Sequence, residues 1–302
     1  MIEDMAMAKA SDRIGGLGRR AGLVAAVGVT AVAATVVARS VDTELLGQAI
    51  GRAADRPLPV ALAVAGFALA FVLRAVAWRH VLPGLSFGQA WSGIHVAVGA
   101  NHVLPLRLGE PLRVLSVVRR AGVPPLAATA STVTMRATDV LTMVGVGIAA
   151  SPTVFTGLLG PVGWILVVAV AGVALASWRW LARLATGAVV GSVGELRLPG
   201  ARVVALAAAA WLAESFVVLE AARLAGIELG WIDAVLVATV AVAAQIAAVA
   251  PGGFGTYEAA SVAAYLAIGI DAEAGLVAAL GAHGLKTAYA LIAGAVALSL
   301  IH

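Results

Sequence analysis

Residues 101–114 read NHVLPLRLGEPLRV, a polar and kinked stretch in a chain that is otherwise made of long apolar runs. A regular helix does not continue unbroken through Pro105 and Gly109, because proline removes a backbone hydrogen bond and glycine weakens the helix interior. At membrane depth, unpaired backbone is tolerated only where protein or a water-filled cavity surrounds it. If the flanking runs are membrane helices, the stretch therefore predicts a helix break beside a polar cavity.

The composition of the whole chain indicates a polytopic membrane protein. Of its 302 residues, 62% are hydrophobic and 12% are charged, and the mean hydropathy of +1.01 excludes an ordinary soluble domain. The chain has no cysteine, which excludes disulfides and thiolate metal sites. A net charge of +4, spread over loops between apolar runs, is typical of membrane orientation signals. We therefore expect no nucleic-acid partner.

Apolar runs long enough to span a bilayer occur six times. They are residues 21–38, 58–80, 124–150, 154–176, 202–225 and 274–300. Two further regions, 87–118 and 231–269, are apolar for about half their length and are then broken by Pro and Gly. The predicted fold is an all-α polytopic membrane protein with about six spanning helices plus two re-entrant helical hairpins. Residues 21–302 would form a single transmembrane domain.

The positive charges indicate an orientation. With both hairpins returning to the side they enter, 14 of the 20 Lys and Arg residues, Arg74 among them, lie at or near the N-terminal side. That side is predicted to be cytoplasmic. Both termini, a basic tail at 1–20 and a connector at 177–201 would then be cytoplasmic, with the chain in the plasma membrane. Complete crossing of both broken regions would leave the other spans in the same orientation, so the charges favour the orientation more than the re-entrance.

The two broken regions share one order of residues. Four positions separate a proline from a glycine in each, an acid follows, and a later glycine precedes two ionisable residues by 14 and 17 positions. The matched pairs are Pro105 and Pro251, Gly109 and Gly255, Glu110 and Glu258, Gly122 and Gly269, Arg136 and His283, and Asp139 and Lys286. Segment 58–150 begins outside and segment 202–300 begins inside. They are therefore predicted to be inverted repeats, an arrangement common in transporters.

The breaks predict where an anion would bind. A second half-helix should start near residue 110, capped by Gly109 or Glu110, and another near residue 256, capped by Thr256. Half-helix N-termini that point inward present free N–H groups and a positive dipole end, which suit an anion. Arg107 and Arg113 add positive charge for a phosphate.

Ionisable side chains inside the predicted spans are the next candidates, because an idle charge at the bilayer centre is unfavourable. Arg136 and Asp139 share a helical face, so they could pair with each other or contact substrate. His283 and Lys286 lack a local acid, and their counter-ion could be Glu258, Glu110, Asp139, Glu214 or a substrate phosphate. Asn101 and Gln245 precede the breaks and could cap unpaired backbone.

The candidate substrate-binding residues are Asn101, Arg107, Glu110, Arg113, Arg136, Asp139, Glu214, Glu258, His283 and Lys286. The predicted helix breaks are Pro105, Gly109, Pro251, Gly252, Gly253 and Gly255. His95 and His102 are too far apart along a helix to chelate one ion, and no H-E-x-x-H motif is present. We expect no metal and no cofactor.

Taken in order, NHVLPLRLGEPLRV, MRATD and PGGFGTYEAA resemble motifs in the transmembrane region of the lysylphosphatidylglycerol synthase family, and the similarity covers about residues 20–300. The matching residues are Asn101, Pro105, Gly109, Glu110, Arg113, Arg136, Asp139, Pro251, Gly252, Gly253, Gly255 and Glu258. The resemblance implies movement of a lipid with a bulky polar head between leaflets. Two-domain relatives carry a soluble aminoacyl-transfer domain after the membrane part. Because this chain ends at His302, we expect no lipid synthesis by that route.

The leading hypothesis is a lipid translocase, or flippase, for a membrane lipid with an anionic phospho-headgroup. One alternative is an intramembrane lipid-phosphate-modifying enzyme, since buried Glu, His and Lys side chains can do acid–base work. No nucleophile–base pair supports that alternative, so we expect no enzyme activity. Another alternative is a non-catalytic membrane partner of a separately encoded glycosyltransferase or synthase. The sequence leaves a homo-oligomer open.

Overall fold

The computed structural model describes residues 39–104, 108–154, 197–246, 248 and 250–300, with isolated positions between 28 and 35 and between 157 and 172. Within these ranges every regular element is a helix, which confirms the predicted all-α class. The predicted tail and most of the connector lie outside the described residues, as do the spans 21–38 and 154–176 apart from isolated positions. So do the helix-break residue Pro105 and the candidate Arg107.

Four described helices are long and apolar enough to cross a membrane. They are α3 (Pro57–Val81), α6 (Pro125–Ala150), α9 (Ala201–Leu224) and α12 (Ala272–Ser299). Each begins and ends within two residues of a predicted span. Local signals set several of these ends: Pro57 and Pro125 occupy the first turns of their helices, and the Asp271 carboxylate caps α12. The interior of each helix lacks the Pro-to-Gly break that divides the two polar regions.

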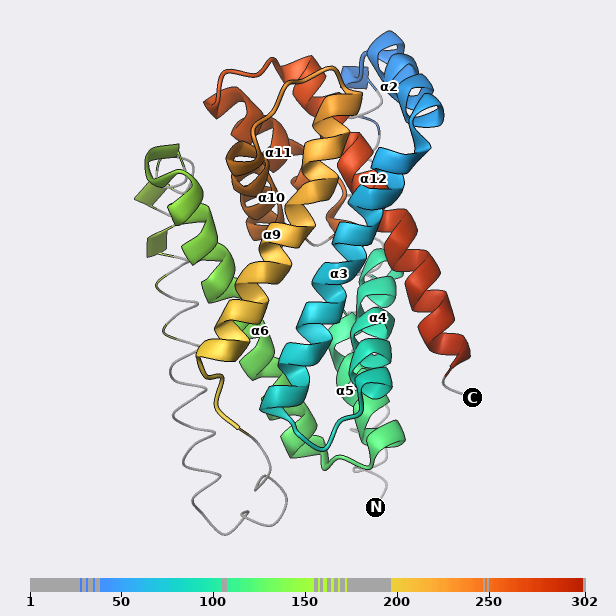
Figure 1. Cartoon of the computed structure of the whole chain (residues 1–302), viewed down its shortest axis with the longest axis vertical. Coiled ribbons are helices and arrows are strands. Elements are labelled where there is room, and N and C mark those ends of the chain that lie inside the picture. Colours follow the sequence, from blue (N-terminus) through green and yellow to red (C-terminus); the bar gives the residue numbers. More distant parts are fainter. Residues whose placement is uncertain are drawn as a thin grey trace, which may run out of the picture.

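The broken regions form two pairs of shorter helices. The first is α4 (Phe87–Val103) with α5 (Gly109–Ala121), and the second is α10 (Trp231–Gln245) with α11 (Thr256–Ala267). A short 3₁₀ helix, η2 (Pro251–Gly253), lies within the second break. In Figure 1, α4 and α5 lie in the lower half of the molecule and α10 and α11 in the upper half.

Each pair of short helices begins and ends at the same end of the bundle (Figure 1). The 17 residues of α4 extend only about 26 Å at 1.5 Å per residue, less than the hydrocarbon thickness of about 30 Å. This arrangement is the one that a re-entrant hairpin requires. Re-entrance into a bilayer itself stays a prediction.

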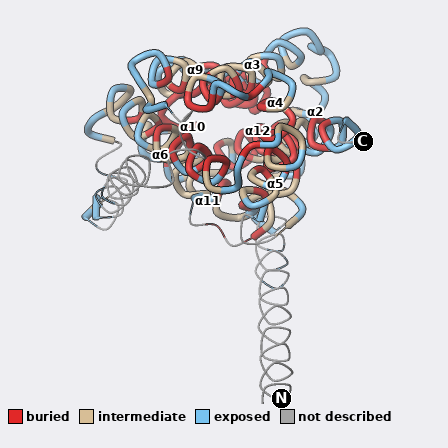
Figure 2. Tube along the Cα trace, turned by 90° about the horizontal axis from the view of Figure 1, so that it is seen from below, coloured by how far each residue is buried: buried red, intermediate tan, exposed pale blue. Residues whose placement is uncertain are grey.

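Both halves of the described chain follow the order long helix, two short helices, long helix. The two leading helices, α3 and α9, pack against each other. Two further contacts cross between the halves, since α4 packs against α12 and α10 packs against α6. Most buried residues face the interior between these helices (Figure 2). The packing agrees with a two-fold relation, while the inverted repeat stays a prediction.

The contact between α4 and α12 is a close crossing of two backbones. A Cβ atom added to Gly294 would lie 2.9 Å from the Cα of Gly99 and 3.2 Å from the carbonyl oxygen of His95. A Cβ on Gly99 would lie 3.0 Å from the Cα of Gly294. Small residues let membrane helices approach in this way. The crossing joins the first hairpin to the last long helix.

A further helix, α2 (Thr43–Asp55), was not predicted from the sequence. The Asp42 carboxylate caps it by accepting hydrogen bonds from the N–H groups of Glu44 at 2.8 Å and Leu45 at 3.0 Å. Nε of Arg52 donates to the carbonyl oxygen of Leu224 at 2.7 Å. These contacts tie α2 to the end of α9.

Candidate functional site

The described helices enclose a cavity of about 160 Å³. Side chains from both halves line it, and nine of the predicted residues are among them. These are Asn101, Arg113, Arg136, Asp139, Glu214, Gly252, Gly253, His283 and Lys286. Glu110 and Glu258 do not line the cavity but contact lining residues. Gly109, Pro251 and Gly255 belong to the adjoining helix breaks.

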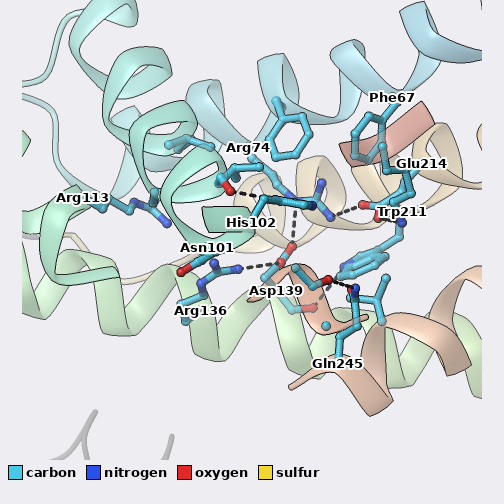
Figure 3. Close-up of a pocket in the computed structure, with 18 of the residues that line it drawn as sticks. Phe67, Arg74, Asn101, His102, Arg113, Arg136, Asp139, Trp211, Glu214 and Gln245 are labelled. Carbon is cyan, nitrogen blue, oxygen red and sulfur yellow. Dashed lines mark hydrogen bonds and ion pairs between the residues drawn. The ribbon is translucent and has the colours of Figure 1, made fainter. Parts of the chain in front are cut away.

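Arg74 lies at the centre of the charged groups (Figure 3). Its Nε donates to Oδ1 of Asp139 at 3.2 Å, and its Nη2 donates to Oε2 of Glu214 at 2.9 Å. The other carboxylate oxygen of Glu214 lies 2.7 Å from Nζ of Lys286. Glu214 on α9 therefore joins Arg74 on α3 to Lys286 on α12.

The charges continue from Asp139 toward α5. Nη1 of Arg136 lies 3.9 Å from Oδ2 of Asp139, which is the predicted pairing across one helical turn. Arg136 also donates through Nε and Nη2 to the carboxylate of Glu110, the Nε bond measuring 2.8 Å. Nη1 of Arg113 lies 4.0 Å from the other oxygen of Glu110.

These contacts make one chain of alternating charges, which we call the ion-pair chain. In order, it contains Lys286, Glu214, Arg74, Asp139, Arg136, Glu110 and Arg113. Cations stand at both ends, so with every group ionised its net charge is +1. The ion-pair chain connects helices α12, α9, α3, α6 and α5 across the cavity.

Aromatic rings hold several of these cations in place. The guanidinium carbon of Arg74 lies 4.7 Å from the centre of the Trp211 ring, and that of Arg113 lies 3.9 Å from the Trp78 ring. Nζ of Lys286 lies within 5.3 Å of two ring centres, those of Phe67 and Tyr257. Such contacts strengthen when water is excluded. The walls therefore fix the cations in a partly apolar environment.

Arg74 lines the cavity but was not among the candidate residues predicted from the sequence. We expected it at or near the cytoplasmic side; only 12% of its side chain is exposed, and it contacts the buried Glu214 and the partly buried Asp139. The available signal was its position, seven residues before the end of a 25-residue apolar helix. A cation so far inside a span is a functional candidate by default.

The two predicted amide caps bridge the helix breaks. The N–H of Gly109 donates to Oδ1 of Asn101 at 2.8 Å. Nε2 of Gln245 donates to the carbonyl oxygen of Gly252 at 2.8 Å. In each break, a side chain from the end of the first short helix satisfies backbone that the break has freed, as predicted.

The expected caps at the starts of the second half-helices were wrong in detail. Helix α5 begins at Gly109 and α11 at Thr256, close to the predicted positions. However, Leu108 is the N-cap of α5 and makes no side-chain cap. Gly255 is the N-cap of α11, and its N–H donates to Oε2 of Glu258 at 2.7 Å. The carboxylate of Glu258, and not the Thr256 hydroxyl, therefore satisfies this helix start.

The second break depends on glycine. Gly252 and Gly253 have φ angles of 64° and 77°, in the left-handed region that other residues rarely adopt. A Cβ on Gly253 would also lie 2.8 Å from Nε2 of Gln245. We call residues 250–255 the glycine loop. Its backbone can approach the cavity because these positions carry no side chain.

His283 holds this loop from α12. Its Nδ1 lies 2.6 Å from Oε1 of Glu258, and its Nε2 lies 3.1 Å from the carbonyl oxygen of Gly252. Both His283 and Glu258 are buried. The partner of His283 is thus Glu258 and that of Lys286 is Glu214, each among the predicted alternatives.

The arrangement is suited to holding an anion. Within the described ranges, no group of three or more His, Asp or Glu side chains is placed to hold a metal ion. Four cations line one cavity, and their carboxylate partners keep them from being bare charges in a low-dielectric site. A phosphate oxygen is an equivalent acceptor for guanidinium and ammonium groups.

Comparison of the sequence with protein-family models gives a match that covers most of the chain. A protein-family model described as the lysylphosphatidylglycerol synthase TM region matches residues 23–294. A search among curated proteins found no match. The matched range contains every described helix except the last few residues of α12, together with the whole cavity.

Proposed function

The chain belongs to the family of the lysylphosphatidylglycerol synthase transmembrane region, and from this premise we propose that it is a lipid translocase. It moves a lipid with an anionic phospho-headgroup between the leaflets of the plasma membrane. The lipid is transported without chemical change. Its headgroup enters the cavity while its acyl or polyprenyl tails stay in the bilayer.

The observation that carries this proposal is the ion-pair chain. It has four cations and three carboxylates inside a membrane domain, and all four cations line the cavity. Charges at membrane depth are costly, and they mark substrate pathways in transporters. The net positive charge favours an anionic headgroup over a neutral or cationic one.

In this proposal the cations and the carboxylates of the ion-pair chain have different roles. Arg74, Arg113, Arg136 and Lys286 bind the phosphate. Glu110, Asp139 and Glu214 hold these cations when the headgroup has left. Because the ion-pair chain links α3, α5 and α6 to α9 and α12, rearranged ion pairs would accompany movement of one half against the other. Such movement exposes a midplane site to each side in turn.

The direct experiment measures lipid movement by the purified protein. Liposomes would contain phosphatidylglycerol, its lysyl form or a polyprenyl-phosphate sugar, each labelled on the headgroup. Accessibility of the label in each leaflet is followed over time, and the lipid is then analysed by mass spectrometry. Selective acceleration of phosphatidylglycerol or of the polyprenyl-phosphate sugar, recovered intact, over the lysyl form with its net positive headgroup is the expected result. Conversion of the lipid, or no acceleration by folded protein, would contradict the proposal.

Two single substitutions test the charged site. Arg136→Gln and Lys286→Gln each remove one cation from the cavity, and we expect each to lower the transport rate by about tenfold or more. The matched control is Arg223→Gln, because the Arg223 side chain is 61% exposed and lies outside the cavity. Transport at the wild-type rate by both folded cavity variants would show that these charges do not bind the headgroup.

A further inference from the structure

The hydrogen bonds of His283 fix the proton on one of its ring nitrogens. Nε2 lies 3.1 Å from the carbonyl oxygen of Gly252. A carbonyl oxygen can only accept a hydrogen bond, so Nε2 must carry a proton and donate. The bond joins α12 to the glycine loop. Because its acceptor is a carbonyl oxygen, the His283 ring must be protonated at Nε2.

The second ring nitrogen then requires one more proton. Nδ1 lies 2.6 Å from Oε1 of Glu258, while Oε2 of Glu258 accepts from the N–H of Gly255 at 2.7 Å. A neutral imidazole protonated on Nε2 would turn the lone pair of Nδ1 toward a carboxylate oxygen, which is repulsive at this distance. The contact is attractive in two states: imidazolium with carboxylate, or neutral imidazole with a carboxylic acid. Both states hold one proton more than a neutral imidazole with a carboxylate.

His95 shows that burial alone does not create this requirement. It is fully buried, and its Nδ1 lies 2.8 Å from the carbonyl oxygen of Trp91, to which it donates. Its Nε2 lies 2.9 Å from the hydroxyl oxygen of Tyr289, and a hydroxyl can donate. A neutral ring satisfies both contacts. The chain therefore contains a neutral buried histidine against which His283 can be compared.

The other ionisable groups around the pair come from several elements. On α12, Lys286 is paired with Glu214 of α9, so that carboxylate serves two cations of the ion-pair chain. On α4, the ring of His102 lies 6.5 Å from that of His283. On α11, the ring of Tyr257 lies 4.6 Å from it. Among the described groups, Glu258 is the acid in contact with His283.

We propose that His283 and Glu258 form a proton-binding site in the wall of the cavity, and that the bound proton fastens the glycine loop to α11 and α12. With the proton lost, one neutral ring cannot donate to both Gly252 and Glu258. Donation to the charged carboxylate is the stronger bond, so the contact to the Gly252 carbonyl is lost. Gly252 and Gly253 line the cavity, and release of the loop therefore alters its wall.

The sign of the pH dependence follows from this geometry. The proton is bound at low pH, where the loop is held by both hydrogen bonds. As the pH rises and the proton is lost, the loop loses its bond to His283 of α12, while Gln245 still donates to the Gly252 carbonyl oxygen. The proton site does not depend on the identity of any substrate. A coupling between the proton and lipid movement does rest on the proposed function.

Nitrogen NMR on the intact protein tests the site directly. The full chain would be labelled with ¹⁵N-histidine and placed in lipid nanodiscs. Its five histidines are assigned by replacing the four other than His283. With the proton bound, we expect the His283 ring to carry protons on both nitrogens, or on Nε2 alone opposite a protonated Glu258; with the proton lost, we expect the ring proton on Nδ1 alone. His95 should stay neutral from about pH 5 to about pH 9. A His283 ring that carries its proton on Nδ1 alone over the whole range would overturn the proposal, because the pair would then hold no extra proton and Nε2 could not donate to Gly252.

Hydrogen exchange tests the consequence for the loop. After correction for the intrinsic pH dependence of exchange, protection of the Gly253 amide should fall by about tenfold or more as the pair loses its proton. Glu258→Gln and His283→Gln should abolish that pH dependence, whereas His95→Gln should retain it. If His283→Gln does not fold, the wild-type and Glu258→Gln curves decide the question. Equal pH dependence in wild type and Glu258→Gln would contradict the proposal.

Transport measured in parallel keeps the two proposals separate. A protein that shows the His283 titration but moves no lipid would contradict the translocase alone. A protein that moves lipid while His283 carries its proton on Nδ1 alone would contradict the proton site alone.

Discussion

Glu214 is the carboxylate on which two cations from different helices depend. One of its oxygens lies 2.9 Å from Nη2 of Arg74 and the other 2.7 Å from Nζ of Lys286. Its side chain is only 6% exposed. Removal of one partner from a buried ion pair leaves an uncompensated charge, which costs more than the pair itself contributes.

We predict that Glu214→Gln lowers the free energy of unfolding by about 3–5 kcal/mol. The amide keeps the shape of the side chain but leaves Lys286 without its carboxylate and Arg74 with only one. Chemical or thermal unfolding in detergent measures the change. Glu220→Gln on the same helix is the control, because its partner Arg223 is mostly exposed and the pair should contribute about 1 kcal/mol or less.

A double variant checks the cause of this loss. Glu214→Gln combined with Lys286→Met removes the stranded ammonium, so it should be more stable than Glu214→Gln alone. Additive losses from the two substitutions would show that Glu214 and Lys286 do not interact.

The candidate site could be predicted in part because charges inside apolar runs are visible in the sequence. Arg136, Asp139, Glu214 and Lys286 were identified in this way, and all four line the cavity. Their pairing could not be derived, since Arg74 and Glu214 are 140 positions apart and meet only through the packing of α3 on α9. Arg74 was missed because a cation seven residues from the end of a span can also be read as a charge at the membrane surface.

At the scale of the helices, the crossing of α4 and α12 predicts that Gly→Ala lowers stability at one position of α12 and leaves it unchanged or raises it at another. Gly294→Ala would place a Cβ 2.9 Å from the Cα of Gly99, and such overpacking costs about 1–3 kcal/mol. Gly284→Ala, also on α12, meets no atom within 4 Å and should be neutral or stabilising by up to about 1 kcal/mol. Unfolding midpoints of the two variants decide the matter. Equal stability would show that the helices do not cross closely.

Element boundaries were predictable where length and breakers determine them. The four long helices and the starts of α5 and α11 followed from apolar runs, Pro and Gly. Helix α2 was not predicted because it is short and its support is tertiary. Leu45 and Leu46 pack against the core, and Arg52 bonds to the end of α9. The sequence of a short polar connection does not indicate these tertiary contacts.

For the whole molecule, the orientation and the re-entrance can be tested by labelling, since the chain contains no cysteine. Gly84→Cys lies between α3 and α4, and Glu228→Cys lies between α9 and α10, at the opposite end of the bundle (Figure 1). In intact cells a membrane-impermeant thiol reagent should reach Glu228→Cys from outside. It should reach Gly84→Cys only after the cells are opened. The reverse pattern would overturn the predicted orientation.

Leu108→Cys distinguishes a re-entrant hairpin from two complete crossings. Leu108 lies at the break between α4 and α5, the end of the pair that would lie within the bilayer if the pair is re-entrant, and it is 46% exposed. If the pair is re-entrant, external reagent should modify Leu108→Cys far more slowly than Glu228→Cys. Equal rates for the two would show that α4 and α5 cross the bilayer completely.

The alternating order of the ion-pair chain has a consequence for affinity. Every cation in it already lies within 4.0 Å of a carboxylate oxygen, so an arriving anion does not meet isolated positive charge. Binding is then a competition between two sets of acceptors, and its free energy is the small difference between two large quantities. Under the proposed function, a site built this way is expected to bind a headgroup only moderately well from either face. A carrier needs that property, because a ligand held tightly on entry would not leave on the other side.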